Sequence, residues 1–90
     1  MTRILLAPSL TIRTNGSAEH SLMPGSIENI FEQLFTRYPT LRDYILDENS
    51  NPREFIAIFR NDVLVNKQYK LSEEIGDDET LIVLQSVPGG

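Results

Sequence analysis

The stretch SIENIFEQLFTRYP, residues 26–39, carries the clearest periodic signal in the sequence. Its apolar side chains recur at the i, i+3, i+4, i+7 spacing of one helical face, and they are Ile27, Ile30, Phe31, Leu34 and Tyr38. Ser26 is a favourable N-cap because its hydroxyl can accept from an amide of the first turn, and Pro39 ends the helix near Arg37. The stretch predicts one amphipathic helix of about three turns, which needs a sheet to pack on.

Before this helix, the sequence predicts a hairpin. Residues 3–13 predict a first strand that is interrupted near Pro8, and residues 17–22 predict a second strand. Asn15–Gly16 is the candidate turn centre, since this pair favours the left-handed backbone of tight hairpin turns.

After the helix, the remaining elements follow in a fixed order. Residues 41–46 predict a short helical turn, residues 55–62 a strong strand and residues 63–65 a short edge strand. Residues 71–75 predict one more helical turn, capped by its serine, and residues 80–87 the last strand. The last strand is nearly continuous in apolar residues, as expected of a central strand, so we place it beside the first strand.

This order of elements predicts the fold class. A helix that joins two parts of one sheet suits a right-handed crossover with the helix on one face. We therefore predict an α+β, β-grasp (ubiquitin-like) fold, with a mixed four- to five-stranded sheet and one main helix packed on one face. Ninety residues suit one domain, so residues 1–90 are expected to form it, with residues 86–90 as a flexible C-terminal tail.

The composition of the chain argues against several classes of function. The chain has no cysteine, which excludes disulfides, thiolate metal sites and a cysteine nucleophile. The formal net charge of −5 disfavours nucleic-acid binding, which needs clustered Lys and Arg. No apolar run approaches the roughly 18 residues that span a bilayer, and the first ten residues read as a strand rather than a signal peptide. We therefore expect a cytoplasmic protein that binds neither nucleic acid nor membrane.

Candidate catalytic residues are few. His20 is the only histidine and lies among polar residues, so an exposed strand position is expected. Residues 47–51, DENSN, are similar to the start of a calcium-binding loop, but Pro52 replaces the required glycine and Ile58 replaces the bidentate glutamate. The sequence therefore supports neither a metal site nor an enzyme.

Alternation along two strands predicts an apolar patch on the face of the sheet away from the helix. If Ile58 points into the core, Phe59 points outward, and by the same rule Ile82 and Leu84 point outward. An open sheet face with several large apolar side chains usually binds something, so Phe59, Ile82 and Leu84 form a predicted partner-binding patch. The alternative is that these are scattered surface residues without a role.

Five segments together resemble the sulfur-carrier branch of the ubiquitin-like proteins, the ThiS/MoaD family, which includes the small subunit of molybdopterin synthase and the thiamine-pathway sulfur carrier. The segments are the helix at 27–39, IAIFRND at 56–62, IGDDETL at 75–81, IVLQSV at 82–87 and PGG at 88–90. The insertion at 45–55 is similar to that of relatives that serve cysteine synthesis and related pathways. The chain departs from the pattern at Gln85, where many relatives have proline, and at Arg60, where they often have an apolar residue.

The resemblance implies a sulfur carrier, a protein co-substrate rather than an enzyme. It implies that a ubiquitin-activating-type partner adenylates the terminal carboxylate of Gly90, and that ATP and magnesium bind that partner, so this chain has no cofactor. A sulfur donor then converts Gly90 to a thiocarboxylate, which gives its sulfur to an acceptor biosynthetic enzyme. Val87, Pro88 and Gly89 would thread the partner's channel, since glycine lacks a Cβ and the Val-Pro pair favours extended backbone. The chain alone is expected to be a monomer.

Two other functions remain open at this point. One is a ubiquitin-like modifier that is conjugated through Gly90 to lysines, and the other is a β-grasp adaptor that binds partners non-covalently. For the carrier itself, the acceptor pathway also stays open between cysteine or another amino acid, thiamine, molybdopterin and a secondary metabolite.

Overall fold

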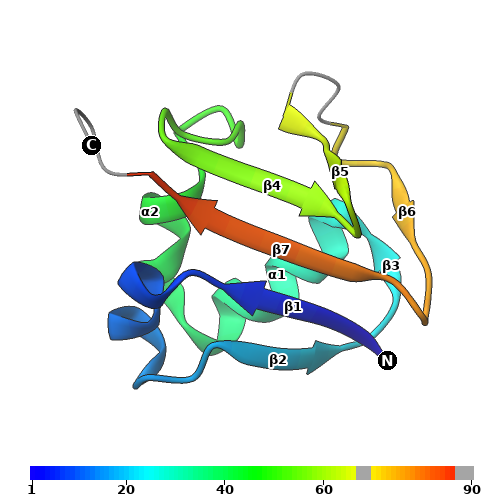
Figure 1. Cartoon of the computed structure of the whole chain (residues 1–90), viewed down its shortest axis with the longest axis horizontal. Helices are drawn as coiled ribbons and strands as arrows, with labels where there is room; N and C mark the ends of the chain where they lie inside the picture. Colours follow the sequence, from blue (N-terminus) through cyan, green and yellow to red (C-terminus); the bar gives the residue numbers. More distant parts are fainter. Residues whose placement is uncertain (67–69, 87–90) are drawn as a thin grey trace.

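A mixed sheet forms the centre of the computed structural model, which describes residues 1–66 and 70–86. Five strands of the described residues make up this sheet in the order β2-β1-β7-β4-β5 (Figure 1). They are β1 (Thr2–Leu6), β2 (Glu19–Leu22), β4 (Ile56–Arg60), β5 (Val63–Leu64) and β7 (Thr80–Gln85). A small second sheet pairs β3 (Gly25–Ser26) with β6 (Glu74–Ile75). The helical elements are η1 (Pro8–Thr14), α1 (Ile27–Arg37), η2 (Pro39–Leu41) and α2 (Arg42–Ile45).

The last strand lies at the centre of the main sheet, as predicted. β7 pairs in parallel with β1, with Ile4 opposite Leu81, and antiparallel with β4, with Ile58 opposite Val83. Helix α1 lies behind this sheet in Figure 1 and is its main helix. The predicted α+β, β-grasp architecture is therefore confirmed.

The core fills the space between α1 and the inward side of the sheet. Ser26 caps the helix by accepting a hydrogen bond from the backbone N–H of Asn29 at 3.1 Å, and the helix ends at Arg37, both as predicted. The buried residues of α1 pack with the inward residues of β1, β4 and β7 in one cluster. These residues are Ile27, Ile30, Phe31 and Leu34 on the helix, and Ile4, Leu6, Ile56, Ile58, Leu81 and Val83 on the strands.

The predicted first strand is too long, because residues 8–14 form the 3-10 helix η1 instead of a strand. The ladder with β7 extends through the N–H of Ala7, which donates to the carbonyl of Val83 at 2.8 Å. Pro8 has no N–H with which to continue a strand, and it suits the first turn of a helix. Asn15 and Gly16, with φ of 55° and 85°, then turn the chain back, so the second strand begins only at Glu19.

The predicted helical turn at 71–75 is wrong, since Glu74–Ile75 form strand β6. Ile75 pairs with Gly25 of β3 and is buried in the core. The carbonyl of Glu73 accepts from the N–H of Ile27 at 2.9 Å, which ties the segment to the start of α1. Tertiary pairing and burial have overridden a local capping signal, as they commonly do for short segments.

Asn66 completes the outer edge of β4 where the short strand β5 ends. Its side-chain Oδ1 accepts from the N–H of Ile58 at 2.7 Å, and its Nδ2 donates to the carbonyl of Ile56 at 2.6 Å. The amide thus makes the two hydrogen bonds that a neighbouring strand would make. This pairing protects part of a sheet edge that would otherwise invite association with another chain.

Arg60 lies at the end of β4 in the inward phase and is held by two carboxylates. Its Nε and Nη2 donate to Glu79 at 2.5 and 2.7 Å, and its Nη1 also donates to Glu73. Glu79 additionally accepts from the N–H of Gly76 at 2.8 Å. These hydrogen bonds, first that from Arg60 and then that from Gly76, lower the pKa of the Glu79 carboxyl from 4.5 to about 2. A charged network of Arg60, Glu73 and Glu79 thus holds this end of the strand.

Glu79 should make stability depend on pH. Its pKa is lower in the folded state, so its contribution is complete above pH 4.5 and is lost as pH falls towards 2. Glu79→Gln is expected to cost about 1–2 kcal/mol at pH 7, since the ion pair is partly exposed and screened. Urea unfolding between pH 2.5 and 7 measures this, with Glu48→Gln in an exposed loop as the control. A pH dependence that Glu79→Gln leaves unchanged would contradict the assignment.

Candidate functional site

The end of strand β7 is held on both sides by neighbouring elements. The N–H of Ser86 donates to the carbonyl of Phe55 at 2.8 Å, which continues the pairing with β4. On the other side, the hydroxyl of Ser9 in η1 donates to Oε1 of Gln85 at 2.6 Å. Figure 1 shows β7 ending on the side of the molecule opposite the N-terminus. Ser86, the first residue of the predicted tail, is therefore hydrogen-bonded to the residue that precedes β4.

The tail residues themselves, Val87, Pro88, Gly89 and Gly90, lie outside the described residues. Their assignment as a reactive terminus and a channel segment stays a prediction from the sequence.

The three predicted patch residues lie together on the helix-free face of the sheet. Phe59 of β4 is directly opposite Ile82 of β7, and Leu84 follows two residues along the same strand. Their inward neighbours Ile58 and Val83 are fully buried under the helix. Phe59 and Ile82 are half-buried, and Leu84 is 44% exposed, so the patch is open to solvent. Sequence alternation thus placed these side chains on the correct face; whether they bind a partner stays a prediction.

Two further large apolar residues extend this surface beyond the prediction. Leu5 of β1 is paired with Ile82, and Leu64 of β5 is paired with Phe59 and is 47% exposed. Alternation in the first strand would have revealed Leu5, because its neighbours point inward. A two-residue strand offers no alternation, so the sequence had no clear signal for Leu64. An exposed ion pair, Arg3 with Glu19 at 2.7 Å, borders the surface on the β2 side.

His20 is buried, which corrects the expectation of an exposed strand histidine. It is paired with the inward residue Ile4 and is only 5% exposed. Its Nε2 lies 2.9 Å from the carbonyl oxygen of Ser17, and its ring packs edge-on against Tyr38 at 5.3 Å between centroids. The prediction relied on the polar neighbours Glu19 and Ser21, but adjacent residues of a strand face opposite sides of the sheet. His20 is accordingly a core residue with a satisfied ring nitrogen.

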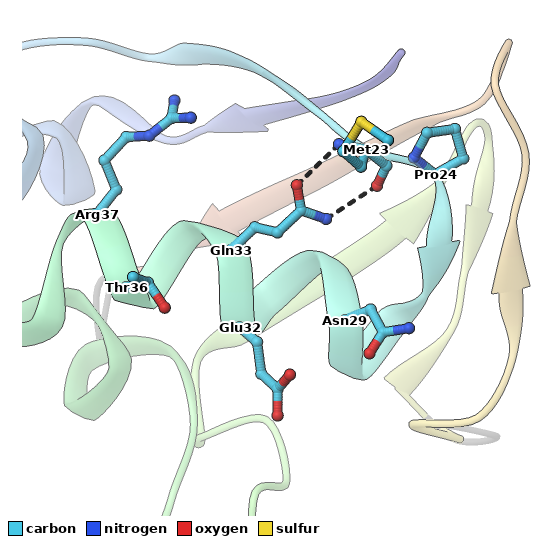
Figure 2. Close-up of a pocket in the computed structure, with 7 residues that line it drawn as sticks. All are labelled: Met23, Pro24, Asn29, Glu32, Gln33, Thr36 and Arg37. Atoms are coloured by element: carbon cyan, nitrogen blue, oxygen red, sulfur yellow. Dashed lines mark hydrogen bonds between the residues drawn. The ribbon is translucent and has the colours of Figure 1, made fainter.

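A shallow groove lies between the β2–β3 connection and the polar side of α1 (Figure 2). Its lining residues are Met23, Pro24, Asn29, Glu32, Gln33, Thr36 and Arg37. Gln33 is fully engaged, because its Oε1 accepts from the N–H of Met23 at 2.8 Å and its Nε2 donates to the carbonyl of Met23 at 3.0 Å. Figure 2 shows Glu32 and Arg37 pointing in different directions. Gln33 therefore holds the β2–β3 connection against α1, and the groove does not bring catalytic groups together.

The described part of the chain has neither a cluster of metal-binding side chains nor a membrane-spanning helix. Within residues 1–66 and 70–86, no three His, Asp or Glu side chains gather in a way that could hold a metal ion. None of the helices described there has the length and apolar character needed to cross a bilayer.

Comparison with known proteins gives matches among solved structures. No protein-family model matches the chain. No curated protein matches it either. A chain in the crystal structure of the Amycolatopsis orientalis BexX/CysO complex is 22% identical, with a TM-score of 0.87 and all of both chains covered. Mycobacterium tuberculosis CysO, described as an antigen, is 20% identical, with a TM-score of 0.84, over 97% of this chain and 100% of that one.

A third similar structure comes from an archaeon. The small archaeal modifier protein 1 (SAMP1) from Methanosarcina acetivorans is 23% identical, with a TM-score of 0.78, over 99% of this chain and 95% of that one. These likenesses extend over nearly the whole length of each chain. They establish that this chain has the ubiquitin-like β-grasp fold.

Proposed function

We propose that the protein is a sulfur carrier whose reactive group is the carboxylate of Gly90. One observation carries the proposal: the sequence Pro88-Gly89-Gly90 comes soon after the end of β7, the central strand of a β-grasp sheet, and that strand carries part of an exposed apolar patch. The resemblance of five sequence segments to the sulfur-carrier family supports it. The similarity to CysO, which was crystallised in a complex with BexX, supports a role that involves a partner protein.

The proposed chemistry takes place at the chain end. A free carboxylate is a poor electrophile, since its charge repels nucleophiles and it lacks a good leaving group. In a ubiquitin-activating-type partner, a carboxylate oxygen of Gly90 attacks the α-phosphorus of ATP, and pyrophosphate leaves. A sulfur nucleophile at the oxidation level of sulfide then attacks the carbonyl carbon, and AMP leaves. The product is a thiocarboxylate, whose sulfur displaces a leaving group from an electrophilic acceptor in a second enzyme. Water then hydrolyses the resulting thioester, which leaves the sulfur on the acceptor and restores the carboxylate of Gly90. ATP and magnesium belong to the partner, and this chain contributes no cofactor.

In this scheme, the apolar patch, the glycines of the tail and the net charge let the partner enzyme recognise the chain. The patch of Phe59, Ile82 and Leu84 gives the partner an apolar surface beside the start of the tail. Glycine at 89 and 90 lets the chain enter a channel too narrow for a Cβ. The net charge of −5 favours approach to a basic surface. The acceptor, whether it serves an amino acid, thiamine, molybdopterin or a secondary metabolite, is chosen by the partner enzymes.

Leu84→Glu should separate folding from partner binding. Leu84 is 44% exposed, so the variant is expected to fold, while the lost apolar contact and the added charge weaken binding to the activating enzyme about tenfold or more. Titration calorimetry with the purified enzyme measures the affinity. Met23→Glu, at a 60% exposed position in the Figure 2 groove, is the matched control. Equal affinity of Leu84→Glu and wild type would remove the patch from the proposal.

A second candidate function is protein modification, which the similarity to a small archaeal modifier protein favours. In this case, Gly90 is joined to lysines of target proteins through an amide bond. Immunoblots of the source cells would then show a ladder of higher-mass adducts that disappears when Gly89 and Gly90 are deleted. A non-covalent adaptor would instead be unaffected by that deletion.

A further inference from the structure

Phe55 adopts a backbone conformation that large side chains rarely take. Its φ is 70°, in the left-handed region. It stands at the third position of a turn that the N–H of Ile56 closes on the carbonyl of Arg53 at 3.0 Å. Turns with a positive φ at this position favour glycine. The other non-glycine residues with positive φ in the described chain are Asn15, Ser50 and Asn61, which are small and polar. For an aromatic residue, the conformation is an outlier that costs stability.

The ring of Phe55 is only partly buried, so its burial offsets the backbone strain less than burial in the core would. The residue is 43% exposed, and its backbone carbonyl accepts from the N–H of Ser86 at 2.8 Å. Glycine would make the same hydrogen bond without strain. The turn therefore requires the backbone at this position but does not require an aromatic ring.

Phe55 lies beside the start of the tail. Its carbonyl accepts from the N–H of Ser86, the first residue of the predicted tail, and Leu84 of the apolar patch lies two residues before Ser86. The neighbouring residues Glu54, Gln85 and Ser86 are polar and exposed. Phe55 thus adds an exposed aromatic residue to a polar stretch of surface next to the tail.

We propose that Phe55 is a contact residue, whose ring packs against an apolar surface of the enzyme that takes Gly90. The inference rests on the proposed function and adds to it a contact outside the predicted patch of Phe59, Ile82 and Leu84. Aromatic side chains supply large contact area at low entropic cost and are enriched among residues that dominate binding. An aromatic ring that is retained despite strain and exposure is well suited to such a contact.

The test compares Phe55→Gly with Asn15→Gly, which makes the same change in backbone freedom at another position with positive φ. Each variant replaces the wild-type gene at its locus in the source cells. The fraction of the protein with a thiocarboxylate end is then measured by intact mass. Phe55→Gly is expected to unfold at the wild-type temperature or higher, and its sulfur-loaded fraction is expected to fall about tenfold. Asn15→Gly should be loaded like wild type. Phe55→Tyr keeps an aromatic ring and should recover most of the loading that Phe55→Gly loses.

The other outcomes overturn the inference in distinguishable ways. Normal loading of Phe55→Gly, with sulfur present on wild type, would refute the contact and leave the proposed function standing. A lowered unfolding temperature of Phe55→Gly alone would show that the ring has a structural role instead. Absence of sulfur from wild type would overturn the proposed function and this inference with it.

Discussion

Deletion of Gly89 and Gly90 is expected to abolish sulfur loading and to leave the folded domain intact. The buried core of the described residues extends from Ile4 to Val83, so all of these core residues remain in the truncated chain. The truncated chain would end at Pro88, and its carboxylate would stop short of the nucleotide in the partner. Intact mass of the purified variant measures loading, and circular dichroism with thermal unfolding measures the fold.

A milder change at the same place provides the graded control. Gly90→Ala keeps the length of the chain and adds one methyl group, so thiocarboxylate formation should fall without a change in unfolding temperature. An unchanged yield with the cognate activating enzyme would contradict the narrow-channel argument, even if the deletion were inactive.

Phe31→Ala is expected to have the largest effect on stability. Phe31 is 2% exposed at the centre of the face that α1 buries, and its ring stacks on that of Phe35 with centroids 5.4 Å apart. Removing such a ring from a core costs about 3–5 kcal/mol. A domain of this size is stable by roughly 5–10 kcal/mol, so the variant should lose a large share of its free energy of unfolding. Urea denaturation measures the loss.

Phe59→Ala is the matched control for this prediction. The same substitution on the half-buried, helix-free face should cost about 1 kcal/mol, since much of the ring is already in contact with solvent. It should nevertheless reduce sulfur loading, which Phe31→Ala would affect only through unfolding. Equal losses of stability for the two variants would contradict the assignment of core and open face.

The sequence predicted the elements whose own pattern decides their structure. Helix α1 has a complete apolar stripe, a serine cap and a terminating proline, and all three act within the segment. The apolar run of β7 likewise indicated a central strand. Residues 8–14 were mispredicted although Pro8 is a local signal, since proline suits both an interrupted strand and the first turn of a helix. Residues 71–75 were mispredicted because a distant strand partner, Gly25–Ser26, decides their conformation. Contacts that far apart in the chain leave little local signal.

In the candidate site, too, a local pattern predicted the placement of some residues and not of others. Strand alternation put Ile82 and Leu84 on the open face, since a period of two follows from backbone geometry alone. The same rule assigned Phe55 to a strand, whereas its positive φ places it in the turn before β4. Nothing in the sequence around Phe55 marks a left-handed residue, because glycine or asparagine would be the usual signal.

The intact mass of the protein, purified under mild conditions from its own cells, tests the central claim most directly. If the protein is a sulfur carrier, part of the population ends at Gly90 and is heavier than the unmodified chain by the difference between one sulfur and one oxygen atom. Treatment with an alkylating reagent should then add a single group at the C-terminus, since the chain has no cysteine. If the whole population has the mass of the unmodified carboxylate at Gly90, in cells that are actively making sulfur-containing products, the result would contradict the account.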